Sequence, residues 1–419
     1  MKRINDIVEW LTIIGFLMVI SAIPFGWSVY HCIGCYIMGF SYLAYILMNR
    51  FWRTWRWDSS KWIYVVMIAL CAIIPIRQLF DDTPPTAYYV HHLHEHVWFL
   101  YLGIAGLIGF PHKFRLWHVS GTMILSSLAI IAYTLFLFYC TAEYSDTTPL
   151  FRFNYLRLMH VNTHMVVNLY FNTALILGFC TLRCWRKRWQ KSLWIIAMAV
   201  IFVCVMLSDG RIGVLTALIT VTACAIYYIA QKNNRWAVGI GCCLVVMAVV
   251  AGAFSPSVKK KDLSSEPRIV VWDYSVRMAE EKPVFGYGLS TLSNEYVERA
   301  YQDSAMYHGF VEKAIQPVPV FAIQGKTMNT HHPHNAFLMY WLAYGIAGVF
   351  LIVALFVLAA MIPVRKEDRL FLYLFLTALF LQALTEPVGT HFHPQFIAMM
   401  LFVWEKTILP LSQSRTECA

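Results

Sequence analysis

Apolar runs long enough to cross a lipid bilayer recur along nearly the whole chain of 419 residues. A transmembrane helix needs about 20 mostly apolar residues. The first run follows Met-Lys-Arg without a small-residue cleavage site, so we interpret it as a retained span and not as a signal peptide. The sequence predicts an all-α polytopic membrane protein with about twelve transmembrane helices, near residues 8–26, 29–48, 61–79, 89–110, 118–140, 165–182, 192–208, 211–230, 236–255, 335–362, 369–386 and 394–411.

The composition argues against most soluble classes of protein. Apolar residues make up 59% of the chain and charged residues only 13%, about half the usual quarter. A soluble fold cannot cover its surface with so few charges, so a soluble enzyme, a disordered protein and a nucleic-acid binder are all disfavoured. The net charge of +10 is better explained by basic loops on one side of a membrane than by a nucleic-acid partner.

Lysine and arginine concentrate in alternate short loops, of which Arg50–Lys61 and Arg183–Lys191 are the most basic. Cytoplasmic loops are enriched in these residues. The alternation predicts that both termini lie in the cytoplasm, which agrees with an even number of spans.

One long polar loop faces outward in this topology and divides the chain into three parts. Residues 1–254 hold spans one to nine, residues 255–334 form the loop, and residues 335–419 hold spans ten to twelve and the C-terminus. Within the loop, apolar spacing predicts helices over Pro267–Met278 and Thr291–Tyr301. Soluble chemistry should therefore concentrate in residues 255–334.

The first candidate site is the Ser208-Asp209-Gly210-Arg211 segment at the outer end of the eighth span. Ser208 or Asp209 is a suitable N-cap for the helix that begins here. A helix N-terminus with an arginine beside it presents unpaired N–H groups and positive charge to an anion such as phosphate. The alternative is a boundary arginine whose side chain reaches lipid headgroups.

The second candidate is Arg268, at the start of the first loop helix, with Trp272 one turn later. The pair fits a cationic site beside an aromatic ring. Taken alone, it fits better a cation–π contact that supports a surface helix.

The third candidate is His334-Asn335, where the long loop enters the tenth span. A histidine at the membrane boundary can act as a general base near neutral pH. Gly345 and Gly348 follow on one predicted helical face, where small residues allow helices to pack closely in lipid. The alternative is a loop histidine hydrogen-bonded to backbone.

Histidines are also frequent elsewhere at the predicted outer face. His92 and His96, within His91–His96, have the spacing of metal ligands on one helical face, and further histidines lie at 160, 164, 391 and 393. Whether His91–His96 and His391–His393 bind a metal stays open at this point. Most of the eleven cysteines lie in apolar runs, where free thiols pack as small hydrophobic side chains.

The chain resembles the O-antigen ligase family, which also includes O-antigen polymerases and protein O-oligosaccharyltransferases. The resemblance covers roughly residues 195–360, and the first six spans match only in hydropathy. It rests on three motifs around the long outer loop: Ser208-x-x-Arg211-x-Gly213, then Arg268-x-x-x-Trp272 with Pro283-x-x-Gly286-x-Gly288, and last His334-Asn335 with Gly345-x-x-Gly348.

The resemblance implies an inverting glycosyltransferase of the bacterial inner membrane that needs no metal or other cofactor and works on the periplasmic side. Its donor would be a glycan on undecaprenyl diphosphate, and its acceptor lipid A–core, a protein or another glycan. By the family's pattern, Arg211 and Arg268 would hold the donor diphosphate, and His334 would orient or deprotonate the acceptor hydroxyl. Ser208, Trp272, Asn335, Gly345 and Gly348 would support these residues.

Three functions stay open on the sequence. A ligase transfers a finished glycan, and a polymerase uses the same donor but joins lipid-linked repeat units. A transporter of a solute or metal would use the outer histidines, although the spans carry few of the buried charges that transport pathways need. We favour a ligase because the motifs of that family are matched best; the acceptor, the sugar, the linkage and the oligomeric state are not determined by the sequence.

Overall fold

The computed structural model describes most of the chain. The described residues are 2–26, 28–49, 57, 59–111, 113–140, 164–208, 210–231, 239, 267–302, 307–312, 317–323, 326–330, 332–386 and 393–408.

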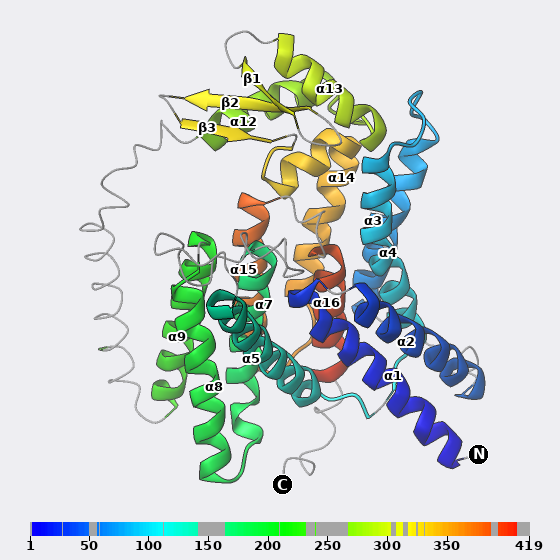
Figure 1. The fold of residues 1–419 in the computed structure, drawn as a ribbon. Coiled ribbons are helices and arrows are strands. Elements are labelled where there is room, and N and C mark those ends of the chain that lie inside the picture. The colour runs from blue at the N-terminus through cyan, green and yellow to red at the C-terminus, as the bar shows by residue number, and fades with distance from the viewer. Residues whose placement is uncertain are drawn as a thin grey trace.

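Long helices dominate the described residues (Figure 1). They are α1 (Lys2–Ala22), α2 (Ser28–Asn49), α3 (Trp62–Gln78), α4 (Ala87–Ile108), α5 (Leu116–Cys140), α7 (His164–Thr181), α8 (Arg188–Met206), α9 (Arg211–Ala230), α12 (Pro267–Glu281), α13 (Leu289–Gln302), α14 (Ala336–Ala360), α15 (Arg369–Thr385) and α16 (His393–Ile408).

The predicted all-α polytopic membrane class is confirmed. Each predicted span coincides with one of these helices, except 236–255, of which only residue 239 is described. Among the described residues, eight helices are long and apolar enough to cross a membrane. The helices α15 and α16, of 17 and 16 residues, are shorter than the 18 residues that this count requires, and α4 is long enough but is not among the eight. The number of spans therefore stays a prediction.

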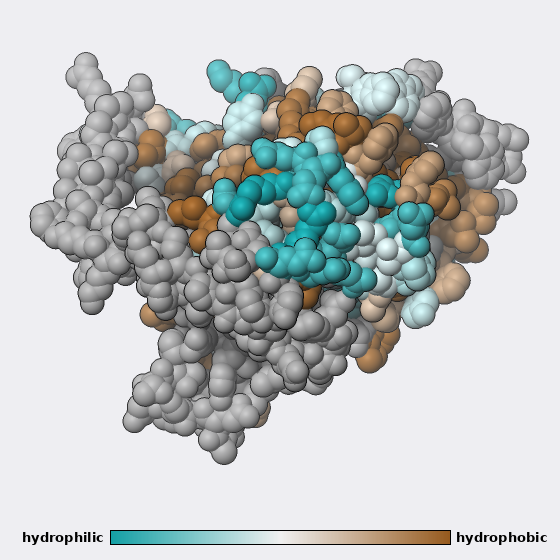
Figure 2. All heavy atoms as spheres, turned by 90° about the horizontal axis from the view of Figure 1, so that it is seen from above, coloured by the Kyte–Doolittle hydropathy of each residue, from teal (hydrophilic) through white to brown (hydrophobic). Residues whose placement is uncertain are grey.

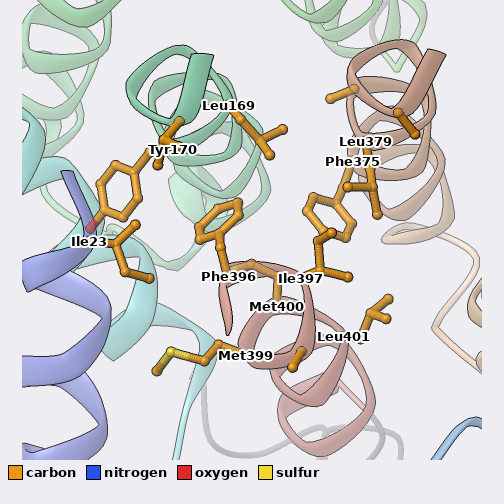
Figure 3. Close-up of a cluster of buried hydrophobic side chains, with 14 of the residues drawn as sticks. Ile23, Leu169, Tyr170, Phe375, Leu379, Phe396, Ile397, Met399, Met400 and Leu401 are labelled. Carbon is orange, nitrogen blue, oxygen red and sulfur yellow. The ribbon is translucent and has the colours of Figure 1, made fainter. Parts of the chain in front are cut away.

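The core of the bundle lies around α7. This helix is buried on nearly every side, and Tyr170, Phe171 and Leu175 are fully buried. Figure 3 shows Tyr170 beside Phe396 of α16, with their ring centroids 5.7 Å apart. Because α7 packs against α5, α8, α9 and α15, it fixes where the ends of α9 and α15 lie.

A separate layer covers one end of the bundle, which we call the loop end (Figure 1). It consists of α12, α13 and a three-stranded antiparallel sheet. The strands are β1 (Tyr307–Glu312), β2 (Pro317–Ile323) and β3 (Lys326–Asn329), in the order β1-β2-β3. The two predicted loop helices are confirmed as α12 and α13. The sheet was not predicted from the sequence. Its strands are short, and a strand makes its hydrogen bonds to neighbouring strands, so no local pattern marks them.

Hydrophilic residues gather at the centre of the loop end, and hydrophobic residues lie around them (Figure 2). Many large apolar side chains on the flanks of the bundle are exposed, among them Phe40, Leu125 and Phe350 at 73%, 67% and 69%. Such a ring of exposed apolar side chains is what a lipid bilayer would cover. The loop end is therefore the polar surface nearest to the sequence-predicted site.

Candidate active site

His334 lies in the turn that starts α14. Its φ angle is 48°, and no other non-glycine residue that the structure describes has a positive φ. The side chain of the next residue, Asn335, caps α14 by accepting from the N–H of Leu338 at 3.1 Å. The left-handed backbone at His334 turns the chain sharply into the capped helix. Strain of this kind costs about 1–3 kcal/mol and is common at functional sites.

The His334 ring contacts Glu386, the residue that follows α15. His334 Nδ1 lies 2.9 Å from Glu386 Oε2, and Glu386 is only 6% exposed. A carboxylate can only accept a hydrogen bond, so Nδ1 carries the proton in this contact. His334 Nε2 is then the ring nitrogen that is left to accept a proton from another molecule.

Glu386 also contacts Arg268 near the start of α12. Arg268 Nη2 lies 3.5 Å from Glu386 Oε1, so one carboxylate joins the second and third sequence-predicted candidates. This contact is long and uses one nitrogen. Arg268 Nε and Trp272 Nε1 are buried with no hydrogen-bond partner among the described residues, so the start of α12 keeps donors for a further acceptor.

The predicted cap of α9 is wrong. The N-cap residue is Gly210, and no side chain caps the helix. The Ser208 hydroxyl instead lies 2.9 Å from Oδ1 of the buried Asn168 in α7. Asp209 lies outside the described residues. Gly210 has no side chain that could cap the first N–H groups of α9, and the exposed Arg211 stands beside them.

Arg211 lies at the same end of the bundle as Glu386. At the opposite end, the Tyr227 hydroxyl of α9 donates to the Glu367 carbonyl oxygen at 3.2 Å, and the Tyr227 and Phe371 rings lie 5.6 Å apart. From these contacts, α9 runs back to Arg211 and α15 runs forward to Glu386. Each stretch is about 24 Å long, at ~1.5 Å per residue, and both run toward the loop end. Arg268 and His334 each contact Glu386 directly, and Arg211 lies at about their level on α9.

Gly345 does not lie on a helical face as predicted. Its φ of 64° and ψ of −155° break α14. The break frees the carbonyl oxygens of Leu342 and Ala343, which accept from the N–H groups of Tyr287 and Gly288 at 2.7 and 2.9 Å. The prediction failed because the loop of the motif Pro283-x-x-Gly286-x-Gly288 docks here.

The glycines are needed for this docking. A Cβ atom on Gly345 would lie 2.1 Å from the Val284 carbonyl oxygen, and one on Gly286 would lie 2.6 Å from the Gly345 nitrogen. On Gly348 it would lie 2.6 Å from the Tyr340 carbonyl oxygen, in the turn before the break. The glycine motifs therefore join the loop that follows α12 to the helix that follows His334.

The outer histidines of α4 have partners within the protein. His91 Nε2 lies 3.2 Å from Glu95 Oε1, and His96 Nε2 lies 2.7 Å from the Tyr340 hydroxyl. Among the described residues, no three His, Cys, Asp or Glu side chains form a group suited to a metal ion. His160 and His391 lie outside the described residues.

Glu386 was missed by the sequence analysis. It directly follows an apolar span and precedes Pro387, so its one signal was a carboxylate at the end of a transmembrane helix. Nothing in the local pattern connects it with Arg268 or His334, which lie 118 and 52 positions away.

Comparison with known proteins supports the resemblance seen in the sequence. A model of the O-antigen ligase family matches residues 196–353. The matched region begins in α8 and ends in α14, and so contains Arg211, Arg268 and His334. No curated protein matches the chain.

Proposed function

We propose that this chain, with its O-antigen ligase match over residues 196–353, transfers a glycan from undecaprenyl diphosphate to an acceptor at the periplasmic face of the inner membrane. The proposed acceptor is lipid A–core. One observation carries the proposal: the Glu386 carboxylate holds Arg268 and His334 together at the loop end of a membrane-embedded bundle.

The donor side of the proposal rests on the arginines. A glycan on a lipid diphosphate transfers when the C1–O bond to the diphosphate breaks and the leaving group takes the electron pair. Arg268 and Arg211 each offer a permanent positive charge with a planar fork of donors, which matches phosphate oxygens. The first turn of α9, which begins after Gly210, adds backbone N–H groups to the same end of the bundle.

The acceptor side rests on His334. The acceptor hydroxyl attacks C1 from the face opposite the diphosphate, so that the anomeric configuration inverts. The Nε2 atom of His334 takes the hydroxyl proton as the new C1–O bond forms. Glu386 keeps the proton on Nδ1 and stabilises the imidazolium that results, as the carboxylate does in a Ser-His-Asp triad.

The proposed reaction requires no metal ion, because guanidinium groups supply the positive charge that a cation would otherwise provide. Transfer by the purified protein should therefore be unchanged in EDTA. Loss of transfer in EDTA, with recovery on adding a divalent cation, would contradict this and support a metal site at the histidine clusters.

The experiment that tests the function compares undecaprenyl-linked glycans in strains with and without the protein. We expect long, fully polymerised chains to accumulate on the carrier when the protein is missing. Single repeat units would instead indicate a polymerase. An unchanged carrier pool would contradict both and favour transport.

A second assay uses the purified protein in liposomes with the lipid-linked donor and lipid A–core. We expect a product that carries the glycan on lipid A–core and a free undecaprenyl diphosphate. The matched control is the Arg277→Ala variant, because Arg277 is an exposed arginine on α12 that pairs with Asp273 at 3.2 Å and has no contact with Glu386 or His334 among those described. Arg268→Ala should abolish transfer, and Arg277→Ala should leave it intact.

A further inference from the structure

The turn that leads into α14 is built from side chains that bond to main-chain groups two residues ahead. Thr330, which is 2% exposed, begins it. Its hydroxyl oxygen accepts from the N–H of His332 at 3.2 Å, and the hydroxyl donates to the His332 carbonyl oxygen at 2.7 Å. Both main-chain polar groups of His332 are thus held by one buried side chain, which restrains the backbone that carries the His332 ring.

His332 repeats this pattern toward His334. Its Nδ1 atom lies 3.3 Å from the His334 backbone nitrogen, and since a backbone N–H can only donate, Nδ1 accepts. An Asn or Asp side chain makes the same contact in an Asx turn, where its oxygen accepts from the N–H two residues ahead. Nδ1 of histidine and Oδ1 of asparagine are both bonded to Cγ. The His332 ring therefore takes the place of an asparagine side chain in this turn.

The contact fixes the tautomer of His332. A neutral imidazole has one N–H, and a protonated imidazole has no acceptor. Because Nδ1 accepts, the ring is neutral and its proton lies on Nε2. The His334 ring, whose centroid is 4.3 Å away, has the opposite tautomer, because its Nδ1 donates to Glu386. Of these two histidines, only His334 presents an Nε2 lone pair that can take a proton.

The same bond restrains the backbone of His334. A residue with a Cβ atom rarely adopts a left-handed φ such as the 48° of His334, and such a backbone persists only where its surroundings hold it. His332 holds the N–H of His334, and Glu386 holds its ring. Without the first bond, the backbone can return to a negative φ, which turns the ring away from Glu386.

We infer that His332 is a positioning residue for transfer. Its Nδ1 atom keeps His334 in the left-handed turn that places the His334 ring against Glu386, and His332 itself takes no proton from the acceptor. The effect on transfer rests on the proposed function, whereas the effect on the turn does not. His331 lies outside the described residues and has no part in this inference.

Two substitutions separate the ring of His332 from its acceptor nitrogen. His332→Asn keeps an acceptor on Cγ and loses the ring, and an asparagine before a proline, here Pro333, favours the start of a turn. His332→Phe keeps a ring and loses the acceptor. His94→Phe is the matched control, because His94 is an exposed histidine on α4 and has no contact with His334 or Glu386 among those described.

We expect His332→Phe to lower kcat in the liposome assay about tenfold to a hundredfold, because a catalytic group displaced by about 1 Å costs up to about 10²-fold in rate. The KM for the lipid-linked donor should be unchanged. His332→Asn and His94→Phe should transfer at nearly the wild-type rate. The thermal midpoint controls for folding, and if His332→Phe is unfolded, His332→Ala, which also lacks the acceptor, takes its place.

Two results of this assay would overturn the inference. One is a wild-type kcat in a folded variant that lacks the acceptor. The other is an equal loss of kcat in His332→Asn and His332→Phe, because the ring of His332 would then act on the substrate itself.

Hydrogen exchange tests the turn without any transfer. Pro333 has no N–H, so exchange at the His334 N–H can be separated from its neighbour in peptide fragments by mass spectrometry. We expect this N–H to exchange about fivefold faster in His332→Phe than in the wild type, because one hydrogen bond is lost, and at the wild-type rate in His332→Asn. Equal exchange in all three proteins would overturn the inference. If exchange differs as expected while the wild-type protein transfers no glycan, the proposed function fails and the turn held by His332 remains.

Discussion

The helix α15 carries a buried carboxylate at each end, and the two carboxylates have different surroundings. Asp368 precedes the helix and is 0% exposed. It pairs with two arginines, Arg183 and Arg365, and the second contact is 2.8 Å long. Glu386 follows the helix and pairs with one arginine at 3.5 Å and with the His334 imidazole at 2.9 Å.

The helix itself favours the first carboxylate over the second. The positive end of the helix dipole lies beside Asp368, and the negative end lies beside Glu386. Asp368 therefore stands in a saturated ion-pair cluster that can serve the fold alone. Glu386 depends on groups from α12 and from the turn before α14, and those groups keep unused donors and a free ring nitrogen. This difference is the reason why we propose the loop end, and not its opposite, as the place for chemistry.

The largest expected effect is the loss of transfer in His334→Ala. Removing a general base costs about 10²- to 10⁴-fold in rate. The measurement is the rate of glycan transfer in liposomes, together with the thermal midpoint as a control for folding. Near-normal transfer by a folded His334→Ala protein would remove this residue from the mechanism.

At the opposite end of α15, Asp368→Asn should damage the fold and spare the chemistry. Breaking a buried ion pair costs about 3–5 kcal/mol. Arg365 would lose its carboxylate partner, and Arg183 would keep only Glu367, at 3.2 Å. Thermal unfolding in detergent should show a large drop in midpoint, while transfer per folded molecule stays near that of the wild type. A stable Asp368→Asn protein that transfers no glycan would contradict the proposed difference between the two ends of α15.

Glu386→Gln should lower transfer by about tenfold to a hundredfold, because a hydrogen bond to a charged group contributes roughly 1.5–3 kcal/mol. The amide keeps the shape of the carboxylate but cannot stabilise a protonated imidazole. The measurement is the rate of glycan transfer in liposomes, compared with that of the wild type. An unchanged rate would leave Glu386 as a packing residue.

Gly345→Ala is expected to have the smallest effect, on stability. The positive φ and the contact with the Val284 carbonyl oxygen should destabilise the protein by about 1–3 kcal/mol and loosen the loop that follows α12. Gly39→Ala in α2 is the matched control, because a Cβ atom there would meet nothing within 4 Å. Urea or thermal denaturation of both variants measures the difference, and equal midpoints would show that the break in α14 is not constrained by the loop.

The sequence by itself determined the membrane class, the helices of the bundle and the candidates Arg211, Arg268 and His334. These features depend on local properties: the length of an apolar run, the charge of a loop, and a residue type at a helix end. These properties can be recognised in the sequence without knowing which other segments pack against them. The same reasoning gave α12 and α13 within the long loop.

Only the tertiary structure decided that Glu386 joins Arg268 to His334, that Gly345 breaks α14 to receive the Pro283–Gly288 loop, and that Gly210 begins α9 without a side-chain cap. Each of these depends on groups that meet across a long separation in sequence, or on a choice between neighbouring caps that packing settles. The local periodicity of a segment is the same whether or not a distant group contacts it. The sequence pattern therefore indicates candidate residues, and the packing of the helices decides which of them meet.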